Sequence, residues 1–128
     1  MKTINDLINH KKMTAQVGFI FETCYILGDV KPNMVHPYLQ SMLEAIEQII
    51  SGKDTKNFVP SKNYILPSHA TELRHLISHK AMSKSRGDIF KACYRLGEKE
   101  GFDESYDLNK IKFFIHDLLE MYDRKEHI

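Results

Sequence analysis

Apolar residues recur along most of the chain at intervals of three and four, which is the period of an amphipathic α-helix. The pattern predicts helices over residues 4–12, 15–27 and 37–50, and again at matching places in the second half of the chain. Thr3 and Thr14 precede the first two helices and are suited to cap them, because a side-chain oxygen there accepts a hydrogen bond from a free N–H group. Ser83 matches Thr14 in the second half of the chain. The pattern therefore predicts a largely helical chain.

Residues with particular backbone preferences suggest where these helices begin and end. Gly28 is suited to the left-handed conformation that ends many helices. His36-Pro37 is predicted to start the third helix, since proline is tolerated at the first helical position. Ser105 is a natural cap for the last helix. The pattern leaves open whether residues 4–27 form one continuous helix or two.

One stretch of the chain occurs twice, and the two copies align without a gap. Residues 4–28 and 73–97 share 12 identities in 25 pairs, whereas unrelated sequences would match at about one or two positions. The apolar period continues in the same alignment beyond this stretch. We interpret the chain as an internal duplication, with repeats at about residues 4–50 and 73–119. The identical pairs are Leu7/Leu76, Ile8/Ile77, His10/His79, Lys11/Lys80, Met13/Met82, Gly18/Gly87, Ile20/Ile89, Phe21/Phe90, Cys24/Cys93, Tyr25/Tyr94, Leu27/Leu96 and Gly28/Gly97.

Neither repeat is long enough to bury its own apolar face, so the two are expected to pack against each other as the halves of a symmetric dimer do. The prediction is an all-α bundle of four to six helices in residues 1–128, a single helical domain built from two internally duplicated helical hairpins with pseudo-two-fold symmetry. Phe21 and Phe90 should meet near the axis. Residues 51–68, which contain two prolines, are expected to cross between the repeats without forming a helix, either packed along the bundle or as a partner-binding loop.

Composition is that of a globular protein, with 42% hydrophobic and 27% charged residues. No apolar run approaches the roughly 20 residues that a membrane span needs, and the N-terminus lacks the apolar core of a signal peptide. A cytoplasmic location without membrane contact is therefore expected. Cys24 and Cys93 occupy matching positions and are expected to be buried thiols rather than a disulfide.

Charge is unevenly distributed although the chain as a whole carries only +1. The net charge is +5 for residues 73–97, zero for residues 4–28 and −4 for residues 98–128. Three lysines of the basic segment would lie on one strip if a helix continued past Met82. We interpret the segment as a candidate partner-binding surface. Its predicted residues are Arg74, His79, Lys80, Lys84, Arg86, Lys91 and Arg95.

The partner expected for this surface is an acidic protein, which makes the chain a small non-enzymatic adaptor, inhibitor or regulator. The alternative is a DNA- or RNA-binding regulator that uses the same basic residues, with Tyr94 available to stack on bases. The near-zero net charge gives no global argument for nucleic acid, and the loop before Ser105 is too long for a helix-turn-helix. The oligomeric state stays open.

A third interpretation is a metal-dependent enzyme centred on His75 and His79. Glu72, His75 and His79 share one helical face, and two histidines four residues apart can chelate zinc. A solvated polar face explains the same residues. His116-Asp117 resembles a pair used by metal-dependent phosphohydrolases, but it lies in the middle of a predicted helix. No glycine-rich phosphate loop is present, and no catalytic residue, metal or cofactor is predicted.

The duplicated pairs His10-Lys11 and His79-Lys80 are polar residues that both repeats share. One interpretation is local, because cations at the end of a short helix favour the negative end of its dipole. The other is that both repeats display the same small contact surface.

Overall fold

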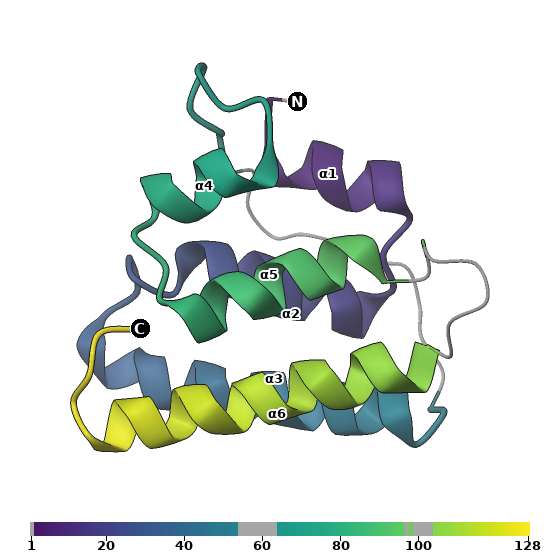
Figure 1. Ribbon diagram of the computed structural model, residues 1–128, viewed down its shortest axis with the longest axis vertical. Helices are drawn as coiled ribbons and strands as arrows, with labels where there is room; N and C mark the ends of the chain where they lie inside the picture. Colours follow the sequence, from purple (N-terminus) through teal and green to yellow (C-terminus); the bar gives the residue numbers. More distant parts are fainter. Residues whose placement is uncertain (1, 54–63, 97, 99–103) are drawn as a thin grey trace.

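The computed structural model describes residues 2–53, 64–96, 98 and 104–128, and α-helices account for most of them (Figure 1). Within these ranges the only pairing of β type is an isolated bridge between Thr3 and Ile65. The predicted all-α bundle is therefore confirmed. The six helices of the described ranges are α1 (Ile4–Lys11), α2 (Ala15–Ile26), α3 (Pro32–Ile50), α4 (Leu73–His79), α5 (Lys84–Arg95) and α6 (Glu104–Asp123).

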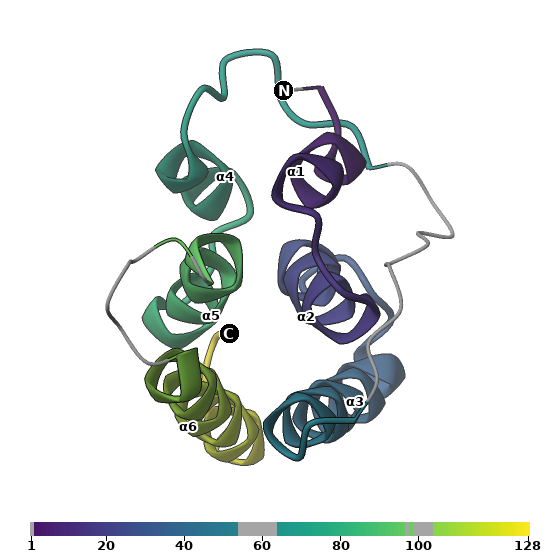
Figure 2. The ribbon, with the colours of Figure 1, turned by 90° about the vertical axis from the view of Figure 1, so that its right-hand side faces the viewer.

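The helices lie in three layers of two, with α1 and α4 at one end of the molecule, α2 and α5 in the middle, and α3 and α6 at the other end (Figure 1). Figure 2 shows α1, α2 and α3 on one side, facing α4, α5 and α6 on the other. The most extensive packing joins α2 to α5, α3 to α6, and each middle helix to the long helix below it. The α2–α5 contact therefore lies at the centre of the bundle.

Side-chain caps start the helices where the sequence placed them. Thr3 and Thr14 accept hydrogen bonds from the N–H groups of Asp6 and Val17, and Ser83 does the same for α5. The Asp6 carboxylate in turn accepts the N–H of Thr3 at 3.0 Å, which completes a capping box. The chain then turns at Lys12, whose φ is 52°, so residues 4–27 form two helices and not one.

Removing either of the two matched caps is expected to destabilise the fold. Thr14→Ala and Ser83→Ala should each lower the free energy of unfolding by about 1 kcal/mol, because an N–H group in the first turn loses its acceptor. Urea denaturation followed by circular dichroism measures this. Ser41→Ala changes an exposed position inside α3 and is the control, with no expected loss in the free energy of unfolding. An unchanged midpoint for Thr14→Ala would contradict its role as a cap.

Two helices begin earlier than predicted. Helix α3 starts at Pro32, which takes the first position, and Pro37 lies inside the helix. Both prolines suit a helix start, so the sequence rule alone does not choose between them. Helix α6 starts at Glu104, and Ser105 therefore lies within the helix and does not cap it.

Gly28 does not take the predicted left-handed conformation. Helix α2 ends through Leu27, whose φ is −56°, and among the described glycines only Gly52 has a positive φ. A methyl group at Gly28 would instead lie 3.5 Å from Nη1 of Arg86. This is an ordinary contact distance, so Gly28 borders the guanidinium at the end of α2 and a methyl group there would fit beside it.

The core is centred on the contact between α2 and α5. The rings of Phe21 and Phe90 stack with centroids 4.2 Å apart, and neither ring is exposed. This confirms the predicted meeting of the two phenylalanines. Cys24 and Cys93 are free and buried, as predicted. Burial raises the pKa of Cys24 to about 12 and that of Cys93 well above its usual value, so both remain thiols.

The predicted crossing segment is described only at its ends, since residues 54–63 lie outside the described residues. Its final part runs beside the start of the chain. The Ile4 N–H donates to the carbonyl of Tyr64 at 3.0 Å, and the Leu66 N–H donates to the carbonyl of Lys2 at 2.8 Å. These bonds hold the entry to the second half against α1.

Candidate partner-binding face

The seven residues predicted to bind a partner do not share one surface. Helix α4 ends at His79 and α5 begins at Lys84, so the predicted single strip through Lys80, Lys84 and Lys91 is wrong. Arg74 and His79 are exposed on α4, where Arg74 pairs with Glu72. The residues on α5 are Lys84, Arg86, Lys91 and Arg95.

Arg86 is buried, which corrects its assignment to an exposed surface. Only 1% of its surface is exposed, and its Nε donates to the carbonyl of Cys24 at 2.6 Å. Nη2 donates to the carbonyl of Tyr25 at 3.2 Å. The last carbonyls of a helix have no partner within it, so the guanidinium completes the end of α2. Burial lowers the pKa of Arg86 from its usual value. Val17 aligns with Arg86 in the first half of the chain and is apolar. This alignment was the signal in the sequence that position 86 is buried.

Two lysines each reach from one half of the molecule to an aromatic ring and an acidic residue of the other half. The ammonium groups lie 4.7 and 4.5 Å from the ring centroids, within the range of a cation–π interaction. Each lysine, with its ring and its acidic residue, forms a set of three, and the three residues of one set align in the sequence with the three of the other, as Phe21 aligns with Phe90. The sets are Lys80 with Tyr25 and Asp29, and Lys11 with Tyr94 and Glu98.

These contacts give the duplicated lysines a role that neither sequence interpretation contained. Lys80 lies 2.8 Å from Asp29 and its side chain is only 22% exposed. Through these contacts Lys80 joins the two halves of the molecule, which is a different role from an interaction with the end of its own helix. Lys80 is therefore already paired across the two halves of the molecule.

The outward side of α5 carries a short basic row. Lys84 and Lys91 flank Asp88, with nitrogen–oxygen distances of 2.8 and 3.4 Å, and Arg95 is exposed one turn further along. Burial acts to raise the pKa of Asp88, but the two lysines outweigh it and hold the pKa below its usual value. Asp88 is therefore ionised at neutral pH, and the row as a whole is positive.

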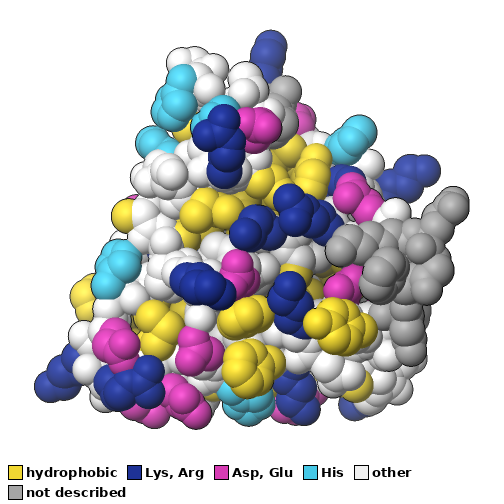
Figure 3. Space-filling view, viewed as in Figure 1, with side chains coloured by type: hydrophobic (Ala, Val, Ile, Leu, Met, Phe, Trp, Pro, Cys, Tyr) yellow, Lys and Arg dark blue, Asp and Glu magenta, His cyan; other side chains and the backbone are white. Residues whose placement is uncertain are grey.

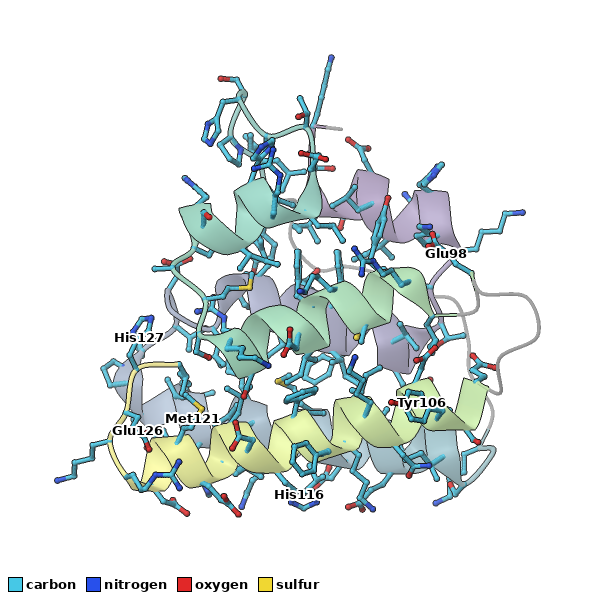
Figure 4. All side chains as sticks on the ribbon, in the orientation of Figure 1. Glu98, Tyr106, His116, Met121, Glu126 and His127 are labelled. Carbon is cyan, nitrogen blue, oxygen red and sulfur yellow. The ribbon has the colours of Figure 1, made fainter. Side chains whose placement is uncertain are left out.

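Helix α6 adds two exposed aromatic side chains beside this row. Tyr106 and Phe113 are 68% and 67% exposed, and their spacing of seven residues puts them on the same side of the helix. Lys110 lies between them, and it lines a depression of about 110 Å³ together with Lys91 and Arg95. Figure 3 shows hydrophobic side chains next to lysines and arginines on this side of the molecule, and Figure 4 labels Tyr106.

We call this surface the α5–α6 face and define it by Lys84, Lys91, Arg95, Tyr106, Lys110 and Phe113. Sequence reasoning missed its α6 half, because the excess of positive charge that marked the candidate surface is confined to residues 73–97. A signal was present, since Tyr106 and Phe113 fall outside the period of the buried residues of α6. Those buried residues are Leu108, Ile111, Ile115 and Leu118.

The histidines interpreted as metal ligands make other contacts. Nδ1 of His75 accepts hydrogen bonds from the N–H groups of Thr71 and Glu72 at 3.0 and 3.2 Å, which occupies that nitrogen at the start of α4. His116 is exposed, and Asp117 accepts a hydrogen bond from Ser85. Among the residues that the structure describes, no group of three or more histidine, cysteine, aspartate or glutamate side chains is arranged to hold a metal ion.

Comparison of the chain with protein-family models, with curated proteins and with solved structures finds no match. None of the helices in the described ranges combines the length and the apolar character required to cross a membrane.

Proposed function

We propose that the chain is a small non-enzymatic binding protein, acting as an adaptor, inhibitor or regulator in the cytoplasm, and that it contacts an acidic protein surface through the α5–α6 face. The observation that carries this proposal is the pair of aromatic side chains, Tyr106 and Phe113, each about two-thirds exposed beside a basic row. Aromatic residues and arginine are enriched in protein interfaces and supply much of their binding energy. The two free buried thiols support a reducing compartment.

The sign of the charge supports an acidic partner. The α5–α6 face carries four basic residues, and two acids, Asp88 and Asp107, share the depression that three of them line. A net positive surface speeds encounter with a negative one and disfavours other partners. The aromatic rings would then supply the apolar contact that the ion pairs lack, since exposed ion pairs contribute little on their own.

We further propose that the two halves are internally duplicated units of three helices each, related by a pseudo-two-fold axis between Phe21 and Phe90. Helices α2 and α5 begin and end at positions that align in the two copies of the repeated stretch, and the two lysine sets are reciprocal. Under this proposal the binding is asymmetric, because the equivalent surface on α2 and α3 lacks the basic and aromatic residues. Its members, in the order of the face defined above, are Ala15, Glu22, Ile26, Pro37, Ser41 and Glu44.

Capture of partners from a lysate of the source cell tests the binding proposal. Tagged protein should capture a defined protein that survives nuclease treatment. The variant K84E/K91E/R95E and the variant Tyr106→Ala/Phe113→Ala should each reduce its recovery at least about tenfold, because they remove the charge and the apolar contact separately.

A matched control separates this effect from a change in net charge. Lys2, Lys31 and Lys53 are exposed and lie outside the α5–α6 face, so the variant K2E/K31E/K53E carries the same charge change. The control variant should recover the same amount of the partner as the unchanged protein. Equal losses in the control and in K84E/K91E/R95E would refute the assignment to this face.

The second candidate function is binding of single-stranded DNA or RNA through the same face. Basic residues beside exposed aromatic rings also suit a strand whose bases stack on those rings. A salt series with generic single and double strands distinguishes the two functions. Affinity that falls steeply with salt concentration and disappears in Tyr106→Ala/Phe113→Ala would favour nucleic acid.

A further inference from the structure

A cleft of about 780 Å³ opens where the end of α2 meets the start of α5. The chain that follows α6 returns along it, and Figure 4 labels His127 in that returning segment. Arg86, Lys80, Asp29, His79 and His127 contribute its polar lining. Most of its remaining wall is apolar and consists of Leu27, Val30, Pro32, Val35, Tyr122 and Ile128.

We propose that this cleft binds a small organic carboxylate with an apolar chain, and that Arg86 receives the carboxylate. The proposal is independent of the α5–α6 face, which lies on the outward sides of α5 and α6. It assigns to the buried arginine a ligand in addition to its contacts with the end of α2.

Arg86 forms no ion pair with an aspartate or glutamate side chain among the described residues, although Asp29 acts on its charge without direct contact. Three of its five N–H groups donate to main-chain oxygens, the third of them to Ile128 at 3.4 Å. The acid in the cleft, Asp29, is paired with Lys80. Buried charges are normally paired. Two N–H groups on a guanidinium that lines the cleft therefore suit a carboxylate, which accepts such donors strongly.

A second cleft at the other end of the molecule provides an internal comparison. It has a volume of about 370 Å³ and is lined in part by Lys11, Val17, Leu96 and Glu104. In the alignment of the two halves of the sequence, these residues match Lys80, Arg86, Leu27 and Val35 of the larger cleft.

The two clefts differ at the residues that a carboxylate with an apolar chain would need. Arg86 is matched by apolar Val17, and apolar Val35 is matched by acidic Glu104. A buried arginine in place of a valine carries a desolvation cost. The hydrogen bonds of Arg86 to the end of α2 offset part of that cost, and an anion bound at its two remaining N–H groups would offset more.

Titration with decanoate and with decanol, followed by the methyl signals of the full chain in ¹H–¹³C NMR spectra, tests the proposal. Decanoate should shift the methyl signals of Val30, Val35 and Ile128 saturably. Its Kd should be at least about tenfold lower than that of decanol, because hydrogen bonds to charged groups contribute about that much or more. Equal Kd values, or shifts of the same size at Val17 and Leu96 in the other cleft, would overturn the proposal.

Substitutions show whether the ligand occupies this cleft. Val35→Phe fills it and should raise the Kd of decanoate at least about tenfold, whereas Glu104→Phe, the matched change in the other cleft, should leave the Kd unchanged. Arg86→Gln should abolish the preference for decanoate over decanol while circular dichroism confirms the fold. If Arg86→Gln fails to fold, the result for Val35→Phe tests the site alone. An unchanged Kd of decanoate for Val35→Phe would refute the site.

Discussion

Phe90→Ala is expected to lower the free energy of unfolding by about 3–5 kcal/mol, and Phe21→Ala by a similar amount. Each change deletes one ring of a stacked pair whose centroids are 4.2 Å apart and which is wholly excluded from solvent. The deletion loses the transfer free energy of the ring and leaves a cavity between α2 and α5. Urea denaturation, followed by the helical signal in circular dichroism, measures the loss.

Phe113→Ala is the matched control, because it removes the same side chain from a position that is 67% exposed. Its expected effect is within about 0.5 kcal/mol of zero. Since the rings of Phe21 and Phe90 touch, the double variant should deviate from additivity by about 0.5–1.5 kcal/mol. If Phe90→Ala were no more destabilising than Phe113→Ala, the contact between α2 and α5 would not be the centre of the fold.

The parts of the fold that the sequence predicted are those set by local rules and by the repeated stretch. Apolar period located the helices, and hydroxyl side chains at Thr14 and Ser83 located two of their starts. The alignment of the two copies predicted that Phe21 and Phe90 would meet, because two equivalent apolar faces that each lack cover can cover each other.

The parts that the sequence could not predict depend on contacts across the bundle. Lys80 looked like a free surface charge until the fold brought Tyr25 and Asp29 to it. Charge alone placed Arg86 on a surface, although an arginine also suits a buried position where helix-end carbonyls accept its N–H groups. No local rule distinguishes these environments, because the partners lie in the other half of the chain. For Arg86, only its alignment with apolar Val17 gave a signal.

Only part of the α5–α6 face could be predicted, because the face also depends on contacts between helices. Its basic row lies within one helix and was visible as a cluster of charge. Tyr106 and Phe113 belong to another helix, and only the packing of α5 on α6 brings the two sets together. An aromatic residue that falls outside the apolar period of its own helix is therefore a signal of an exposed contact, which charge alone does not provide.

Separating the two halves is expected to abolish folding of each. A fragment of residues 1–53 and a fragment of residues 64–128 should each lose most of the helical circular dichroism signal of the intact chain. Ile20, Phe21 and Cys24 are wholly buried in the intact chain, and without α5 the face around Phe21 would be open to water. Isolated helices of 7 to 20 residues are marginal in water without such packing.

Mixing the two fragments in equal amounts should restore the helical signal, because each supplies the cover that the other lacks. Introducing Phe90→Ala into the second fragment should weaken this association at least about 100-fold, in line with its expected effect on the intact chain. Helix formation by residues 1–53 alone that depends on concentration would indicate pairing with a second copy through α2, as the proposed pseudo-two-fold relation between the duplicated units implies. A fragment that stays folded as a monomer at every concentration would instead show that α2 does not require α5. The internal pairing at Phe21 and Phe90 would then be a consequence of the fold and not its cause.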